Sequence, residues 1–383
     1  MPSRDAREGL AGLDTPCALV DVPRLQHNIS RMQQRLDGLG VAFRPHVKTS
    51  KCLPVVRSQL AAGARGITVS TLREAKQFHA AGISDILYAV CIVPGKLPAA
   101  LALRRQGCDL RLVTDSVEGA QAIVAFAREH GEVFEVWIEI DVDGHRSGIA
   151  PRAEALLEVG RTLHDGGQRL GGVMAHAGSS YELCEPDALR RLAEQERAGT
   201  VQAAERLRAA GLPCPVVSVG STPTALSAEA LPGVTEVRAG VYVFFDLVMR
   251  NVGVCTPQDL ALSVLTTVIG HQPEKGWVIV DAGWMAMSRD RGTQRQQHDF
   301  GYGQVCDEAG QWIDGYVMDS ANQEHGIVCR RGEADPDIAR RFPLGARLRI
   351  LPNHACATGA QHPVYQALLA DGQVQAWPRF YGW

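Results

Sequence analysis

The chain has 383 residues, 45% of them hydrophobic, which is enough for one large domain and a smaller one, each with its own core. Its 39 lysines and arginines nearly balance its 42 acidic residues, and the charges are scattered, so nucleic acid and anionic membranes are not expected partners. The charged N-terminus lacks an apolar core segment, and no later apolar run is long enough to cross a bilayer. We therefore expect a cytoplasmic enzyme.

The predicted elements alternate between short apolar, β-branched runs and Ala- and Leu-rich stretches with helical spacing. Eight strands are expected at 43–48, 66–70, 85–90, 109–115, 134–141, 171–176, 215–219 and 235–242. Helices are expected between them, for example at 71–81, 116–130 and 186–210. This alternation predicts an α/β fold, a parallel (β/α)8 TIM barrel over residues 22–260, with a doubly wound sheet as the alternative.

Strand-like segments and turns replace the helical spacing from about residue 261 onward. The expected strands of this part are 261–270, 276–282, 346–351 and 373–377. An extended segment at 15–21 precedes the first barrel helix and could join them. Residues 1–21 and 261–383 are therefore expected to form a separate β domain.

Lys48 lies in the stretch Arg-Pro-His-Val-Lys-Thr-Ser, where the first barrel strand is expected to end. Catalytic residues of such barrels lie at the C-terminal ends of the strands. A lysine in a buried site near other cations loses its proton more readily, so it can hold an aldehyde cofactor as a Schiff base. A solvated surface lysine is the alternative, and Lys51 is the nearest competitor for the role.

Two further turns follow the last two expected barrel strands. Gly220, Ser221 and Thr222 come directly after one strand, and Gly240 lies at the end of the next. Backbone N–H groups and hydroxyls at the start of a helix suit a phosphate, and an ordinary helix cap is the alternative explanation of the first turn. Two adjacent phosphate-binding turns opposite Lys48 indicate pyridoxal 5′-phosphate as cofactor.

His176 ends one expected barrel strand, and Arg146 follows another. His176 could stack against the pyridine ring of the cofactor, or it could be a hydrogen-bonded histidine at a strand end. Arg146 could keep the phenolic oxygen of the cofactor ionised, or it could be a surface charge.

His354 and Cys356 form the candidate metal site. The chain has ten cysteines without a Cys-x-x-Cys pair, so most are expected to be buried thiols. In an extended segment the i, i+2 spacing would direct the imidazole and the thiolate to one side, and this pair suits zinc with coordination positions left open for catalysis. A buried histidine and cysteine near a turn are the alternative.

Six motifs together carry a resemblance that covers nearly the whole length. They are Pro-His-Val-Lys-Thr, His-Ala-Gly-Ser-Ser-Tyr, Gly-Ser-Thr-Pro-Thr, Arg-Ala-Gly-Val-Tyr-Val-Phe-Phe-Asp, Gln-Glu-His-Gly and Pro-Asn-His-Ala-Cys. The chain resembles the D-serine dehydratase and D-threonine aldolase group of pyridoxal phosphate enzymes, whose barrel is shared with alanine racemase. The resemblance implies a homodimer, a Schiff-base Lys48 and ring stacking by His176.

The resemblance also implies roles for further residues. Tyr181 would contact the ring nitrogen, and the phosphate contacts would come from Ser221, Thr222, Gly240 and Tyr242. A divalent metal (Zn, Mn, Co or Mg) would bind His354 and Cys356. The aldolases of the group typically have an aspartate as second ligand, so Cys356 favours the dehydratases.

The activity implied is removal of water from a D-3-hydroxy amino acid, giving a keto acid and ammonia. Serine would give pyruvate, and 3-hydroxyaspartate would give oxaloacetate. Retro-aldol cleavage to glycine and an aldehyde is the alternative within the group. A hydrolytic metalloenzyme would normally have a His-x-His pair on its first strand, where this chain has His46-Val47-Lys48, and a non-catalytic cofactor-binding barrel would need no metal pair.

Overall fold

The computed structural model describes residues 9–383, which divide into two compact units. One unit contains the described residues up to Ile29 together with Val241–Tyr381, and the other contains Ser30–Gly240 and Gly382–Trp383. The first division falls inside helix α2 (Val22–Gly38). The domain boundaries expected at residues 22 and 260 remain a prediction, and the part of the expected β domain before residue 9 lies outside the described residues.

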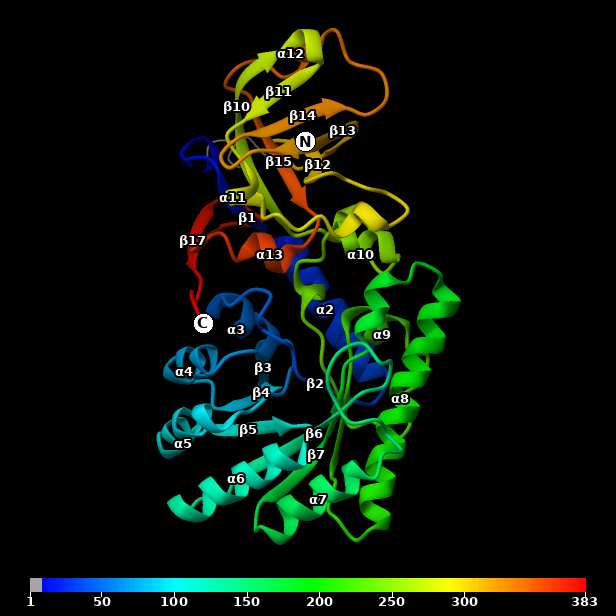
Figure 1. Ribbon diagram of the computed structural model, residues 1–383. Helices are drawn as coiled ribbons and strands as arrows, with labels where there is room; N and C mark the ends of the chain where they lie inside the picture. The colour runs from blue at the N-terminus through cyan, green and yellow to red at the C-terminus, as the bar shows by residue number, and fades with distance from the viewer. Residues whose placement is uncertain (1–8) are drawn as a thin grey trace. The chain divides into compact units, whose positions relative to one another are not determined.

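The unit around Ser30–Gly240 contains eight parallel strands in the order β2-β9-β8-β7-β6-β5-β4-β3 (Figure 1). They are β2 (Ala42–Phe43), β3 (Ile67–Val69), β4 (Asp85–Cys91), β5 (Asp109–Thr114), β6 (Glu135–Ile140), β7 (Arg169–Ala175), β8 (Val216–Val219) and β9 (Glu236–Val237). The two ends of this order are joined after β2, where Thr68 N donates to Pro45 O at 2.8 Å and Val47 N donates to Thr68 O at 2.9 Å. The predicted barrel is therefore confirmed.

Helices follow the strands of this unit along the chain. They are α3 (Leu53–Ala61), α4 (Leu72–Ala80), α5 (Leu97–Arg105), α6 (Val117–His130), α7 (Ala155–Asp165), α8 (Pro186–Ala209) and α9 (Thr222–Ser227). Local capping sets several of their ends. The Thr71 side chain accepts from the N–H of Glu74 to begin α4, and Ser116 accepts from Gly119 to begin α6. Gly131 ends α6 in the left-handed conformation, which a glycine adopts without steric cost.

Two barrel strands are shorter than the sequence predicts. β2 ends at Phe43 rather than at residue 48, because Pro45 has no N–H to donate and the chain turns over residues 47–50. β9 ends at Val237 rather than at residue 242, because the chain continues into the 3-10 helix η3 (Val241–Val243). Lys48 therefore lies in a turn just beyond the strand rather than on it.

The other unit contains a nine-stranded, mainly antiparallel sheet in the order β11-β14-β13-β12-β15-β10-β1-β16-β17. Its strands are β1 (Cys17–Asp21), β10 (Leu262–Gln272), β11 (Trp277–Val280), β12 (Gly303–Asp307), β13 (Trp312–Ala321), β14 (Gly326–Arg330), β15 (Arg347–Pro352), β16 (Val364–Leu368) and β17 (Val374–Pro378). β1 pairs with β10 and β16, so the segment at 15–21 does join the β domain. The sequence did not predict β12, β13, β14 or β16.

Short helices connect the strands of this sheet. They are α10 (Leu247–Val252), α11 (Trp284–Met287), α12 (Ile338–Arg341) and α13 (Ala355–Gly359). Within residues 9–383, no helix combines the length and the apolar character that crossing a membrane would require.

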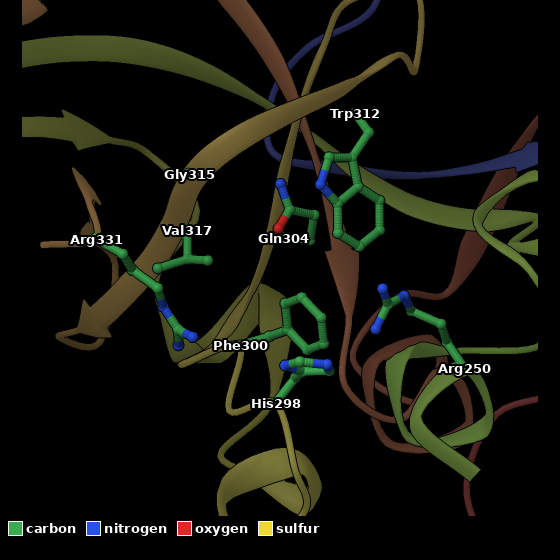
Figure 2. A pocket seen from close by; sticks show the side chains of 8 residues that line it. All are labelled: Arg250, His298, Phe300, Gln304, Trp312, Gly315, Val317 and Arg331. Atoms are coloured by element: carbon green, nitrogen blue, oxygen red, sulfur yellow. The ribbon is translucent and has the colours of Figure 1, made fainter. Parts of the chain in front are cut away.

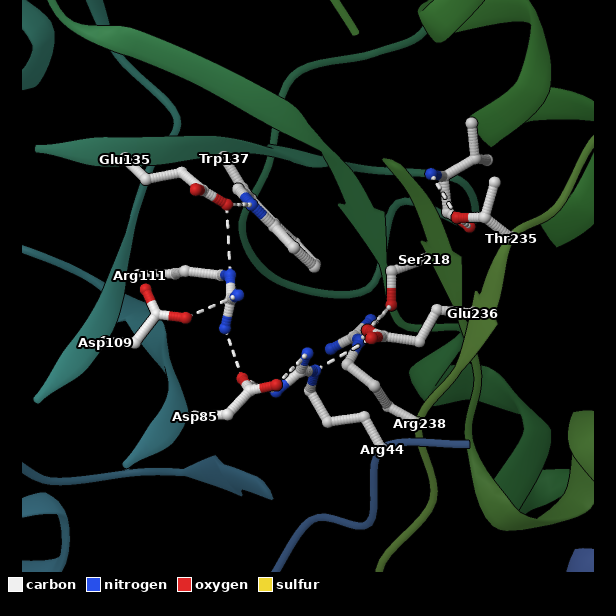
Figure 3. A network of polar contacts seen from close by, with 11 residues as sticks. Arg44, Asp85, Asp109, Arg111, Glu135, Trp137, Ser218, Thr235, Glu236 and Arg238 are labelled. Carbon is white, nitrogen blue, oxygen red and sulfur yellow. Dashed lines mark hydrogen bonds and ion pairs between the residues drawn. The ribbon is translucent and has the colours of Figure 1, made fainter. Parts of the chain in front are cut away.

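A network of ion pairs joins the N-terminal ends of barrel strands (Figure 3). Four of its acidic residues each begin a strand: Asp85, Asp109, Glu135 and Glu236. The guanidinium of Arg44 contacts Asp85 Oδ1 at 2.5 Å and Glu236 Oε2 at 2.7 Å, so it links β4 to β9 beside the two-residue strand β2. Arg111 continues the network from Asp85 to Glu135. Side chains thus connect the barrel where β2 offers few backbone hydrogen bonds.

Replacing Arg44 by methionine should destabilise the fold by about 3–5 kcal/mol, because the buried carboxylate of Glu236 would lose its ion-pair partner. Urea unfolding monitored by circular dichroism measures the effect. Arg340→Met is the control, since the Arg340 side chain is 83% exposed and its pair with Asp337 should contribute less than about 1 kcal/mol. Equal unfolding midpoints for the two variants would contradict this role of Arg44.

Candidate active site

Lys48 and Lys51 have different surroundings. Lys48 is exposed in the turn after β2, and its backbone N–H lies 3.5 Å from His46 Nδ1. The ammonium of Lys51 lies 3.1 Å from Glu74 Oε1, a carboxylate that is itself 1% exposed. The ion pair with this buried carboxylate occupies the amine of Lys51, so the amine would have to leave Glu74 before it could bond to a cofactor. The geometry therefore favours Lys48 over Lys51 as the cofactor lysine.

Basic side chains converge around His46 at the C-terminal ends of the barrel strands. Burial, followed by the positive charges of Lys48 and Arg238, lowers the pKa of His46 well below its usual value, and His176 and Arg146 act in the same direction. These groups bring several N–H donors and positive charge to one end of the barrel. Such a donor set fits an anionic, phosphorylated cofactor.

His176 is a neutral imidazole at the end of β7. Burial, together with the charges of Arg146 and Lys48 and opposed by the hydrogen bond to the carbonyl of Gly220, lowers the pKa of His176 to about 3. Nδ1 of His176 lies 3.0 Å from Gly220 O, so this nitrogen carries the proton and donates. The ring centroids of His176 and Tyr181 are 6.1 Å apart, and the two ring planes are inclined to each other by 44°.

The low pKa of His176 predicts acid sensitivity of the apoprotein. Below the unfolded pKa of 6.5, the unfolded chain binds a proton that the folded protein does not bind until about pH 3. The free energy of unfolding should therefore fall as the pH decreases through this window, by up to roughly 1.4 kcal/mol per pH unit. His176→Gln retains a hydrogen-bond donor without titrating, so urea unfolding should show a weaker loss of stability for the variant than for wild type between about pH 6.5 and about pH 5. Parallel pH profiles would refute the assignment.

Glu196 connects the loop after β7 to the loop after β8. Its Oε1 accepts from the N–H of Ala177 at 2.9 Å and from the N–H of Gly220 at 3.0 Å, and the side chain is 1% exposed. A buried carboxylate with two backbone donors holds both loops in place. The sequence motifs did not point to Glu196, although a signal exists: this glutamate interrupts the buried face of α8 between Ala193 and Thr200.

Ser221 is the N-cap of α9. Its hydroxyl accepts from Thr224 N at 3.2 Å, and Thr224 Oγ1 accepts from Ser221 N at 3.0 Å. The cap explanation of this turn therefore applies, and phosphate binding by Ser221 and Thr222 remains a prediction. Gly220 has φ +131°, and a Cβ there would collide with the carbonyl oxygen of Arg238, so only glycine fits.

Gly240, Arg146 and Tyr242 complete the predicted cofactor residues. A Cβ on Gly240 would lie 3.1 Å from His46 O, so this glycine permits close packing against the Lys48 loop. The Arg146 side chain is 51% exposed, and its Nη2 lies 3.8 Å from Glu139 Oε1. Tyr242 is fully buried in η3, which belongs to the unit containing the β sheet. Their contacts with a cofactor remain predictions.

His354 and Cys356 lie where β15 leads into α13. His354 is the N-cap of α13, and Cys356 lies in the first turn of this helix. The extended geometry expected from their spacing is therefore wrong: a strand-to-helix turn, rather than a pleated strand, places the thiol in hydrogen-bonding contact with the imidazole. Imidazole and thiol still face each other, as a shared metal would require.

Two carboxylates surround the candidate metal pair. Asp290 Oδ2 lies 2.6 Å from His354 Nδ1, so Asp290 can hold this nitrogen and leave the other for a metal. Asp246 accepts from the N–H of Ala355 at 2.9 Å. Burial lowers the pKa of His354, but Cys356, Asp290 and Asp246 outweigh burial and raise it well above the usual value. This excess of negative partners around one imidazole fits a divalent cation.

The residues around this pair could not be found from local sequence. Asp290 and Asp246 lie 64 and 109 residues from the groups that they contact. Sequence spacing carries no signal for such contacts.

Cys91, Asp115 and Glu139 form a second group whose ligand atoms lie within 4.8 Å of one another. Burial, reinforced by Glu139 and Asp115, raises the pKa of the Cys91 thiol far above its usual value. The protonated thiol lies 3.3 Å from Glu139 Oε2 and donates to it. Since metals bind the thiolate, this group has a weaker donor set than the pair at His354. Glu139 of this group also lies close to Arg146, with 3.8 Å between Glu139 Oε1 and Arg146 Nη2.

An eight-stranded parallel barrel and an antiparallel β domain, with a lysine among basic groups at the C-terminal ends of the barrel strands, define the alanine racemase-like class of enzymes. The family model described as the alanine racemase N-terminal domain matches residues 20–248. The model described as a putative serine dehydratase domain matches residues 261–368. The chain belongs to the alanine racemase-like family, in the group that carries the serine dehydratase domain.

Known relatives agree with this assignment. The chain is 71% identical to the D-threo-3-hydroxyaspartate dehydratase of Delftia sp. (strain HT23), over 98% of this chain and 100% of that protein. The solved structure of the Delftia sp. HT23 enzyme has a TM-score of 0.97 over 98% of this chain and 100% of that one. A cysteine-to-alanine mutant of D-threo-3-hydroxyaspartate dehydratase, solved in the metal-free form, is 70% identical over 98% of this chain and 100% of that one, with a TM-score of 0.97. The D-threonine aldolase of Arthrobacter sp is 29% identical over 98% of this chain and 94% of that protein.

Proposed function

We propose that this chain is a dehydratase that converts D-threo-3-hydroxyaspartate to oxaloacetate and ammonia, using pyridoxal 5′-phosphate and a divalent metal. The observation that carries the proposal is the 71% identity to a D-threo-3-hydroxyaspartate dehydratase over the full length of that protein. Identity to the D-threonine aldolase is only 29%, so the aldolase reaction has less support than the dehydratase reaction. In the net reaction, water leaves in the elimination and is taken up again when the resulting enamine is hydrolysed.

Lys48 is proposed to be the residue that would hold the cofactor, and its amine, when free, would accept the proton from Cα of the substrate. The cofactor, when bound, supplies an electron sink for the negative charge left on Cα. His176 supports this role because its low pKa keeps it neutral, so it presents a flat, uncharged ring. Glu196 holds the backbone of the two loops that carry His176 and Ser221.

The remaining cofactor contacts are proposed from the resemblance and from the placement of the residues. Arg146 is proposed to lie against the phenolic oxygen, held by Glu139, and Tyr181 against the ring nitrogen. The phosphate contacts are proposed to come from Ser221, Thr222, Gly240 and Tyr242. The basic groups around His46 support an anionic ligand at this end of the barrel.

His354 and Cys356 are proposed to bind the metal, with Asp290 fixing the orientation of the imidazole. A divalent metal at this pair supplies a Lewis acid that helps the β-hydroxyl leave. The metal-free cysteine-to-alanine mutant of the related dehydratase supports a metal in this group of enzymes. Zinc is our first choice for a histidine and a thiolate, ahead of manganese, cobalt and magnesium. A homodimer in the cytoplasm is part of the same proposal.

Product analysis tests the proposed reaction. The holoenzyme should release equal amounts of ammonia and oxaloacetate from D-threo-3-hydroxyaspartate, and should be slower with D-serine, D-threonine and the erythro isomer. Malate dehydrogenase with NADH measures oxaloacetate, and amino-acid chromatography measures glycine. Glycine as the main product would replace the dehydratase by an aldolase. Pyruvate from D-serine at the higher rate would make the chain a D-serine dehydratase.

A further inference from the structure

A cavity of about 190 Å3 lies on the unit that contains the β sheet, and none of its lining residues belongs to the proposed cofactor or metal sites. It is bounded by α10, by the segment before β12, and by β12 and β13 (Figure 2). The side chains that matter here are Arg250, His298, Phe300, Gln304, Trp312 and Arg331. Its volume would accommodate a small organic molecule rather than a nucleotide.

The lining of this cavity is basic. Figure 2 shows Arg250 and Arg331 reaching toward Phe300 from opposite sides, with His298 next to the ring. No lining residue in the described part of the chain is acidic. Neither Arg250 nor Arg331 forms an ion pair with a carboxylate of residues 9–383. Positive charge without a protein counter-charge favours an anionic ligand.

Arg250 carries the clearest sign of a missing partner. Its guanidinium lies 5.4 Å from the ring centroids of both Phe300 and Trp312, so the two rings fix its position. Nη1 is 3.3 Å from Asn251 Oδ1, whereas Nε is buried and has no hydrogen-bond partner in the structure. A buried N–H without an acceptor is unfavourable, and a carboxylate oxygen would satisfy it.

The uncharged residues that line the cavity indicate the chemical character of the uncharged part of the ligand. Phe300 and Trp312 form an edge-to-face pair with centroids 5.7 Å apart, so the two rings provide apolar walls at nearly right angles to each other. The amide nitrogen of Gln304 is occupied by the carbonyls of Val305 and Ile313, at 2.8 and 2.9 Å. The aromatic walls would therefore contact a planar apolar body, and the arginines its charge.

We propose that this cavity is a binding site for a small carboxylate with a planar apolar body, held by Arg250 and Arg331 and packed against Phe300 and Trp312. It is a site additional to the proposed reaction. The carboxylate would accept a hydrogen bond from Arg250, whose Nε has no acceptor within the protein. The affinity should decrease with ionic strength, because the rim is open to solvent at Arg331.

Calorimetric titration of the holoenzyme with benzoate tests the proposal, with benzamide as the uncharged analogue and inorganic phosphate as the anion without an apolar body. Benzoate should bind saturably and at least tenfold more tightly than either of the others. Arg331→Gln and Arg250→Gln should each weaken benzoate binding at least tenfold. Arg331 is exposed, so this variant should fold even if the Arg250 variant does not.

Arg340→Gln is the matched control, since Arg340 is an exposed arginine of the same unit that does not line the cavity. It should bind benzoate like wild type. The proposal is overturned if benzoate gives no saturable heat, if benzamide binds as well as benzoate, or if Arg331→Gln leaves binding unchanged. A change of oligomeric state in Arg331→Gln, without benzoate binding to wild type, would also overturn it and would make the cavity part of a contact between copies.

Discussion

Lys48→Ala should abolish the visible absorbance of the lysine-bound cofactor and reduce turnover by roughly 10³-fold or more, because one amine both anchors the cofactor and accepts the Cα proton. The structure supports Lys48 through its position in the turn after β2 and through the basic groups around His46. Absorbance spectra of the purified protein and a coupled oxaloacetate assay measure the two effects.

Lys76→Ala is the matched control, since Lys76 is an exposed lysine on α4 of the same unit. Its spectrum and rate should equal those of wild type. Borohydride reduction followed by peptide mapping should label Lys48. A label on Lys51 would show instead that the ion pair with Glu74 opens in the holoenzyme, and the assignment of Lys48 would be withdrawn.

Cys356→Ala should lose most of the bound metal and nearly all ammonia production while retaining the cofactor absorbance. The reason is that His354 alone would remain of the proposed ligand pair, and Asp290 is held at the other nitrogen of its ring. Metal content by mass spectrometry, together with the ammonia assay, measures the effect. Chelation of wild type should reproduce the variant, and a thiophilic metal should restore wild type only.

Cys356→Asp tests the role of the thiolate more closely. An aspartate can retain some metal, but a harder ligand should shift the balance from elimination of the hydroxyl toward cleavage of the Cα–Cβ bond. The measured quantity is the ratio of ammonia to glycine. Cys356→Ala protein with full metal content and full ammonia production would show that Cys356 is a core thiol, and the metal assignment would fall.

The barrel could be predicted from sequence because its determinants are local. Apolar β-branched runs and helical spacing alternate eight times. Helix caps such as Thr71 and Ser116 bond to a residue within the next four positions, so they can be recognised from the local sequence. The first barrel strand ends earlier than its apolar residues predict, because Pro45 lacks the N–H that a longer strand would need. Strands β12, β13, β14 and β16 were not predicted; in three of these, β12, β13 and β14, the strand pairing contains a register shift.

The candidate site, like the fold, has features that the sequence predicts and features that it does not. The sequence by itself determined which residue types are available: a lysine after the first barrel strand, a Gly-Ser-Thr turn, and a histidine close to a cysteine. These motifs are contiguous, so their chemistry is visible without a fold. Their placement at strand ends followed from the alternation of strands and helices.

Only the tertiary structure decided how those groups are held and charged. Glu74 pairs with Lys51 rather than with Lys48, and Glu196 joins two loops through backbone N–H groups. Asp290 reaches His354 from 64 residues away. Such contacts, and the burial that lowers or raises a histidine pKa, depend on distance in space, because electrostatic and hydrogen-bond energies fall with separation of the atoms and not of the residues along the chain.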